Sequence, residues 1–150
     1  MDALKIFMLT GILLVIILLY AINWNHVEVD VKNYQSVDVS LDGHAVGLLA
    51  GCKKLYIETV PWKLESIRVG MEEKTPQRPE SHDLIVDVIN INGKPRMVLI
   101  NGLHDARLII SGLRESNMDA EPDDAIAVAV RTGIPIYVKK SFLESGTYMC

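Results

Sequence analysis

Acidic side chains and a histidine are concentrated in two short stretches of this chain. Asp119, Glu121, Asp123 and Asp124 place four carboxylates within six positions, and Ser81-His82-Asp83 lies farther toward the N-terminus. Carboxylates held this close repel one another unless a cation neutralises them. The first cluster therefore suits a hard divalent cation such as Mg²⁺, Ca²⁺ or Mn²⁺, or acid–base chemistry on a phosphorylated substrate.

The same residues also have a purely structural explanation. Acidic side chains at the start of a helix interact favourably with free N–H groups and the helix dipole, by about 0.3–1 kcal/mol each. Because histidine gains and loses a proton near neutral pH, His82 is a candidate general acid, general base or metal ligand. His82 and Asp83 are equally compatible with a surface or capping position. Residue types and spacing leave both alternatives open.

Other familiar site patterns are missing from the sequence. It contains no GxGxxG, P-loop or HExxH motif. Cys52 and Cys150 are too few and too far apart for a disulfide framework or a CxxC metal site, and Cys52 is predicted to be a structural thiol. We expect Trp62 to belong to the core. The formal charge is −4, and the sequence lacks the clustered cations that are typical of nucleic-acid binding.

The N-terminal segment is strongly apolar. Residues Ile6 to Ile22 form a run of seventeen positions without a charge, and Asn23, Trp24 and Asn25 extend it to twenty. At about 1.5 Å per residue, this length crosses a hydrocarbon core of roughly 30 Å. A cleaved signal peptide and a buried core helix are the alternatives. The length of the run and the lack of an A-x-A cleavage site favour a single transmembrane anchor at residues 1–25.

The charges around this segment bear on its orientation. Lys5 precedes the apolar run, and the next cation after it is Lys32. The positive-inside rule then favours a cytoplasmic N-terminus. We therefore expect a single-pass membrane protein whose domain, residues 26–150, lies outside the cytoplasm.

Hydrophobic periodicity predicts an α+β domain. Expected strands cover residues 27–31, 37–41, 45–49, 55–59, 97–100, 106–110 and 134–138, with turn residues at 33–36. Expected helices run from Pro61 to about Glu73, from an N-cap at Ser81 to 90–93, and from Asp123 or Asp124 to Gly133. In the second helix, Leu84, Ile85, Val88 and Ile89 form one apolar face. Hairpin connections between strands indicate a mostly antiparallel sheet covered on one face by helices.

Two separated segments together resemble a known family. They are Arg78–Leu84 (RPESHDL) and Asp119–Val138 (DAEPDDAIAVAVRTGIPIYV), and the likeness covers about Val27 to Leu143. The chain resembles the bifunctional nuclease (BFN) domain family, formerly a domain of unknown function. The resemblance implies a compact α+β fold that self-associates and a nuclease activity on DNA and RNA.

The resemblance also assigns roles to residues. It implies catalytic positions at His82, Asp83, Asp119 and Asp124. Our hypothesis is that Asp119, Asp124 and Asp83 hold a divalent cation, Mg²⁺ or Mn²⁺, which generates hydroxide, while His82 transfers a proton on the phosphodiester.

Three positions depart from the family pattern. Glu121 stands where the family has arginine, Asp123 where it has serine, and Val60 where it has glycine. Replacing arginine by glutamate removes a bidentate phosphate partner and adds repulsion toward a polyanion. The alternative to a membrane-anchored nuclease is therefore a non-catalytic binding or assembly module that keeps the fold.

Overall fold

The computed structural model describes residues 8, 10–18, 29–72, 80–112 and 115–150. Its elements follow one another as β1 (Tyr34–Asp42), β2 (Ala45–Ala50), β3 (Lys53–Glu58), α2 (Pro61–Met71), α3 (Ser81–Asn92), β4 (Lys94–Gly102), β5 (Asp105–Ser111), β6 (Ser116–Ala120), α4 (Pro122–Thr132), β7 (Ile136–Lys139), α5 (Lys140–Leu143) and β8 (Thr147–Tyr148). This order confirms the predicted α+β class.

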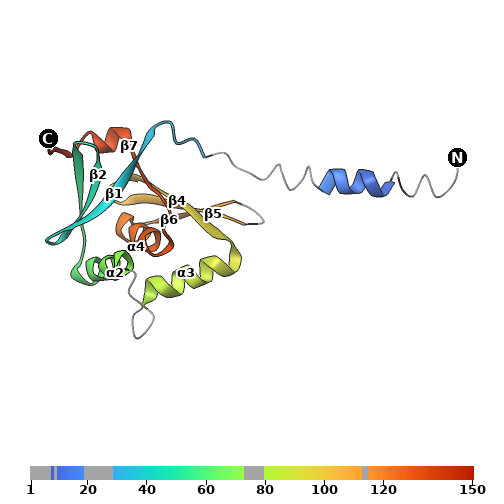
Figure 1. Ribbon diagram of the computed structural model, residues 1–150, viewed down its shortest axis with the longest axis horizontal. Helices are drawn as coiled ribbons and strands as arrows, with labels where there is room; N and C mark the ends of the chain where they lie inside the picture. The colour runs from blue at the N-terminus through green and yellow to red at the C-terminus, as the bar shows by residue number, and fades with distance from the viewer. Residues whose placement is uncertain (1–7, 9, 19–28, 73–79, 113–114) are drawn as a thin grey trace.

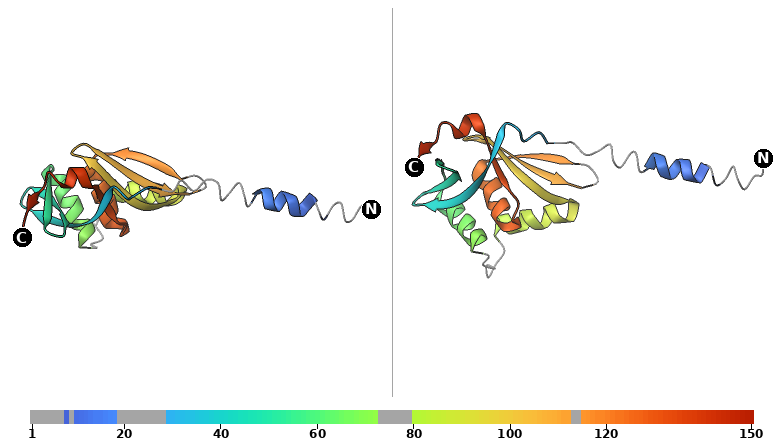
Figure 2. Two further views of the ribbon diagram at one scale, coloured as in Figure 1. Left: turned by 90° about the horizontal axis from the view of Figure 1, so that it is seen from above. Right: turned by 45° about the horizontal axis from the view of Figure 1, so that its top comes forward.

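The strands form one eight-stranded sheet in the order β6-β5-β4-β7-β1-β2-β3-β8. Neighbouring strands are antiparallel except for β4 and β7, which are parallel. The sheet is therefore mostly antiparallel, as predicted. Figures 1 and 2 show α2, α3 and α4 together on one side of this curved sheet, with α4 in the middle.

The core lies between α4 and the sheet. Ile126 of α4 and Val46, Val98 and Val138 of three strands are completely buried. Helix α4 begins with Pro122 at its first turn and ends at Gly133, whose φ of 67° is left-handed. The end was predicted, because glycine tolerates this conformation at a helix end. The start lies before the predicted Asp123 or Asp124, because proline suits the first turn of a helix and is included in it.

The first strand differs from the expectation. Residues 29–31, the described part of the strand predicted at 27–31, are irregular, and the predicted turn residues 34–36 lie inside β1. Tyr34 to Val37 pair with Lys139 to Ile136 of β7. Pairing with a strand far away in sequence therefore overrides the local turn preference.

Helix α3 begins one residue earlier than predicted. Its N-cap is Glu80, not Ser81, because Glu80 and Asp83 form a reciprocal capping box. Of the predicted apolar face, Ile89 is buried, whereas Leu84 and Val88 are more than half exposed. We define the α3 apolar face as its exposed members: Leu84, Ile85, Val88 and Ile91.

A disulfide joins Cys52 to Cys150 across a sequence separation of 98, with Cα atoms 5.2 Å apart. The prediction that Cys52 is a thiol is wrong. Strand β8 returns beside β3, where Tyr148 pairs with Lys53, and this pairing brings Cys150 to Cys52. In the chain-entropy model, a cross-link that closes a loop of this size contributes about 4–5 kcal/mol.

Part of the predicted anchor is described. Met8 and residues 10–18 are helical, whereas residues 1–7, 9 and 19–25 lie outside the described part. Within the residues that the structure describes, no helix has both the length and the apolar character needed to span a membrane.

Candidate functional site

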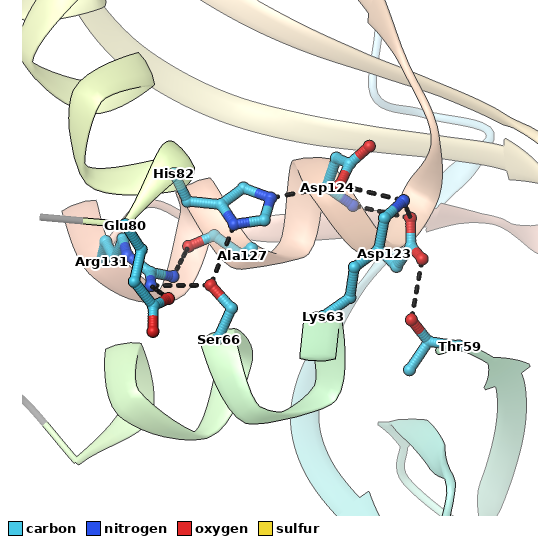
Figure 3. A network of polar contacts seen from close by, with 9 residues as sticks. All are labelled: Thr59, Lys63, Ser66, Glu80, His82, Asp123, Asp124, Ala127 and Arg131. Atoms are coloured by element: carbon cyan, nitrogen blue, oxygen red, sulfur yellow. Dashed lines mark hydrogen bonds and ion pairs between the residues drawn. The ribbon is translucent and has the colours of Figure 1, made fainter. Parts of the chain in front are cut away.

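The starts of three helices converge at one place. Pro61 at the first turn of α2 and Pro122 at that of α4 begin two of them, and the Glu80 capping box begins α3. The first turns of these helices carry Lys63, His82 and Asp124, and Figure 3 shows the three side chains grouped together. Sequence segments far apart therefore supply one polar cluster.

His82 is at the centre of this cluster. It is 2% exposed, and both of its ring nitrogens have partners: Nδ1 lies 2.9 Å from Ser66 Oγ, and Nε2 lies 3.1 Å from Asp124 Oδ1. An ionised carboxylate can only accept, so Nε2 carries the hydrogen that faces Asp124. In neutral imidazole Nδ1 then accepts from the Ser66 hydroxyl. His82 is consequently a buried residue that orients Asp124, not a surface cap.

Lys63 neutralises the two acidic residues at the start of α4. Its Nζ lies 2.9 Å from Asp123 Oδ1 and 3.0 Å from Asp124 Oδ1. Burial lowers the pKa of Lys63, but the hydrogen bonds to both carboxylates outweigh this effect and raise it above its ordinary value. Asp123 also accepts a hydrogen bond of 2.8 Å from Thr59. Lys63 therefore stays positively charged, and Asp123 is fully engaged.

Arg131 ties the other end of the cluster together. It donates to Asp83 Oδ1 at 2.7 Å, to Glu80 Oε2 at 3.0 Å and to Ser66 Oγ at 2.8 Å. Burial raises the pKa of Asp83, but hydrogen bonds from Arg131 and from the Glu80 backbone N–H lower it overall. Asp83 is thus a structural anion that holds α3 against α4.

A cavity of about 390 Å³ opens beside the cluster. We call it the catalytic cavity, after the predicted catalytic residues that line it. Its lining includes His82, Asp119, Asp124, Lys63 and Trp62. The structure therefore brings three of the four predicted site residues to one cavity, and Asp83 is not among its lining residues.

Asp119 reaches this cavity from an element that the sequence did not predict. It lies on β6, where the register pairs it with Arg107 of β5. Its side chain is 89% exposed, and its Oδ1 is 3.7 Å from Arg107 Nε. Asp119 and Asp124 are thus the carboxylates that the catalytic cavity offers from the predicted set.

The three carboxylates of the predicted metal set lie in separate ion pairs. Asp83, Asp119 and Asp124 are paired with different cations, namely Arg131, Arg107 and Lys63. Among the described residues, no group of three or more histidine, cysteine, aspartate or glutamate side chains is arranged to hold a metal ion. Magnesium can also be bound by one or two carboxylates together with substrate phosphate. Asp119 and Asp124 line the cavity, whereas Asp83 is bound by Arg131 outside its lining.

Sequence reasoning missed several members of the cluster. Lys63, Ser66 and Arg131 are isolated polar residues within amphipathic helices, and such residues resemble ordinary surface positions. Trp62 was expected in the core but is 60% exposed, and its ring stacks near that of His82 with centroids 6.5 Å apart. The burial of His82 had one sequence signal: it lies seven positions before the buried Ile89, on the same helical face.

The region that contains this site matches a known family. A model of the bifunctional nuclease domain matches residues 50–149, which include all of the catalytic cavity. The chain belongs to the bifunctional nuclease domain family. The predicted resemblance is thereby confirmed, and the helix starts described above belong to the region that this family shares.

Two relatives of the BFN-domain chain are proteins of Mycobacterium tuberculosis, from strains CDC 1551 and H37Rv. Each is named only as an uncharacterized protein and is 37% identical over 86 residues. The match covers 53% of this chain and 51% of each relative. The chain thus spans about half the length of these curated relatives.

The role of Arg131 in this BFN domain can be measured by substitution. Arg131→Ala leaves Glu80, Asp83 and Ser66 without their shared donor, so we expect the free energy of unfolding to fall by about 3 kcal/mol. Urea unfolding followed by circular dichroism measures the change. Arg107→Ala, which removes an exposed ion pair, should cost no more than about 1 kcal/mol. Equal decreases in the free energy of unfolding for the two variants would contradict the proposed anchoring role of Arg131.

Proposed function

We propose that this domain is a divalent-cation-dependent nuclease that hydrolyses phosphodiesters in the catalytic cavity. The observation that carries the proposal is the hydrogen-bonded series from Arg131 through Ser66 and His82 to Asp124, which ends at this cavity. Such a series holds one carboxylate in a fixed orientation where substrate can approach. Fixed orientation of an acceptor is what general-base catalysis requires.

Asp124 is the proposed general base. His82 and Lys63 both contact its Oδ1, and Oδ2 makes no hydrogen bond to the described residues. Oδ2 would accept the proton of the attacking water as the new P–O bond forms and the bond to the leaving oxygen breaks. His82 does not touch the substrate in this mechanism and is a positioning residue for Asp124.

We propose that a divalent cation binds in the same cavity. Asp119 and Asp124 are both acidic and would repel a phosphodiester unless a positive charge neutralises them. Asp119 would hold Mg²⁺ or Mn²⁺ together with a substrate phosphate oxygen, and Asp124, whose free oxygen acts as the base, would add negative charge beside the ion. When bound, the ion would neutralise charge and lower the pKa of a coordinated water.

Lys63 and Trp62 would bind the substrate itself. Lys63 Nζ lies 5.6 Å from the centre of the Trp62 ring, so a cation and an exposed aromatic surface are adjacent. Proteins that bind single-stranded nucleic acid combine such features, because aromatic rings stack with bases and cations contact phosphates. We therefore propose single-stranded DNA or RNA as the preferred substrate.

We also propose that residues 1–25 anchor the protein in a membrane as a single-pass helix. The described side chains of residues 10–18 are all exposed, and most of them are apolar. A disulfide between Cys52 and Cys150 persists where the environment is oxidising. The apolar segment supports the anchor, and the disulfide supports a domain that lies outside the cytoplasm.

A second candidate function is self-association through the α3 apolar face. Ile91 is 82% exposed, and Leu84 and Ile85 lie along the same side of the helix. Contiguous exposed apolar side chains commonly mark interaction sites. A symmetric contact between two copies of α3 would bury them.

The nuclease proposal predicts a large effect of Asp124→Asn. This variant keeps the shape of the side chain but removes the base, so we expect the rate to fall at least about 100-fold. The assay uses the full chain in detergent and a labelled single-stranded oligonucleotide, with Mg²⁺, Mn²⁺ or EDTA. Asp119→Asn should raise the metal concentration needed for half-maximal rate.

The matched control for this assay is Asp38→Asn, an exposed aspartate on β1. It should leave the rate unchanged within about twofold. Absence of cleavage under all three conditions, or equal rates for Asp124→Asn and the wild type, would reject the proposal. Full activity in EDTA would reject the cation requirement alone.

The proposed location predicts the state of the cysteines in cells. In cells that express the full chain, both thiols should resist a maleimide reagent until a reductant is added. A chain that lacks residues 1–25, and so stays in the reducing cytoplasm, should react without reductant. Gel mobility after acid trapping measures this difference. Immediate labelling of the full chain would contradict an oxidising location.

Self-association predicts that Ile91→Asp lowers the molecular mass in solution. A buried charge without a partner destabilises an apolar contact strongly. Sedimentation velocity of the full chain in detergent should show a shift from dimer to monomer. Asn90→Asp adds the same charge to α3 outside the α3 apolar face and should leave the dimer intact. A wild-type chain that is monomeric at high concentration would remove this candidate.

A further inference from the structure

A second cavity of about 580 Å³ adjoins the catalytic cavity. It lies between the start of α2, the turn that joins β4 to β5, and the start of α4. Trp62 and Lys63 line both cavities, so the two meet at these residues. Its volume falls within the range of small-molecule sites, which is about 300–1,000 Å³.

The walls of this cavity are mostly apolar and include one exposed aromatic ring. Val60 and Leu103 are about half exposed, and Trp62 is 60% exposed. An indole left this accessible offers a flat surface on which another planar ring can stack. The cavity is therefore suited to a planar heteroaromatic group.

The polar groups of the cavity are chiefly acceptors of hydrogen bonds. Glu58, Glu121 and Asp123 line it, and His104 Nδ1 lies 3.4 Å from Glu121 Oε2. Asp123 is already bound by Lys63 and Thr59, whereas the Glu121 side chain is 53% exposed and can reach a ligand. Three carboxylates disfavour a phosphate at this position. They favour a neutral ring that carries N–H donors.

Guanine is the nucleobase whose edge matches a carboxylate best. Its N1–H and 2-amino group are parallel donors, and a carboxylate can accept from both through its two oxygens. Adenine and cytosine present an amino group beside a ring acceptor, which a carboxylate repels. A carboxylate in a base pocket therefore discriminates by donor pattern, as in other protein–base contacts.

We propose that this second cavity is a guanine-binding pocket in which the base stacks on Trp62 and Glu121 accepts hydrogen bonds from N1–H and the 2-amino group. The inference rests on the proposed nuclease function. The guanine would lie in this pocket while the phosphate next to it lies in the catalytic cavity, and Lys63 lines both. This arrangement makes Glu121 a specificity-determining residue. The pocket would select the nucleotide next to the cleaved bond.

The test measures binding apart from cleavage. Calorimetry of the full chain in detergent, with EDTA present, compares GMP with IMP, which lacks the 2-amino group, and with AMP. We expect GMP to bind at least about tenfold more tightly than either. A thymidine oligonucleotide with a single dG, compared with an all-thymidine one, determines whether guanine within a nucleic acid is recognised as well as the free nucleotide.

Glu121→Gln should abolish the tenfold preference for GMP. Glu121 makes no side-chain cap hydrogen bond in α4, so the variant keeps the helix start. Glu65→Gln, an exposed glutamate on α2, is the matched control and should keep the preference. Equal binding of GMP and IMP to the wild type, or a preference that survives Glu121→Gln, would overturn the pocket.

The outcomes separate this inference from the nuclease proposal. Guanine-selective binding without any cleavage under the assay conditions above supports the pocket and rejects the hydrolytic function. Cleavage without guanine preference supports the hydrolytic function and rejects the pocket.

Discussion

The position of the whole site depends on the guanidinium of Arg131. Arg131 lies in the last turn of α4, yet it contacts Asp83 and Glu80 at the start of α3 and Ser66 in the middle of α2. Its side chain is 7% exposed, so these charge-assisted hydrogen bonds are shielded from water. A planar group with five donors can hold three helices in one arrangement, which lysine cannot do. The orientation of His82, and through it of Asp124, follows from this arrangement.

Sequence patterns predicted the features that depend on nearby residues. The end of α4 at Gly133 follows from a local signal and was predicted, and the helix starts at Pro122, just before the predicted Asp123 or Asp124. The antiparallel hairpins also follow from alternation and turn residues. Strand β6 was missed because Ser116 to Ala120 contains one large apolar residue, Met118, and no alternating pattern. Its existence depends on pairing with β5, which periodicity does not reveal.

In the candidate site, too, local features were predicted and features that depend on packing were not. His82, Asp119 and Asp124 were found because their residue types can do chemistry and because they lie in the motifs shared with the BFN family. Their partners were not found, since Lys63 and Arg131 acquire their roles only when separate helices pack together. Asp123 shows how a partner from another helix determines the role of a residue. Where the family pattern has serine, this chain has a second carboxylate, and both Lys63 and Thr59 bind it. The substitution is thus compensated within the cluster.

The two outer strands of the sheet, β6 and β8, determine how copies of the domain can meet. An outer strand with free backbone groups is a template for adding strands from other molecules, and proteins block such addition with charge or with a covering segment. Here β6 has five residues and carries the exposed Asp119, whereas β8 has only two residues. Both borders of the sheet therefore offer little length for another strand to pair with. Short and charged borders limit edge-to-edge addition when copies of the domain lie close together.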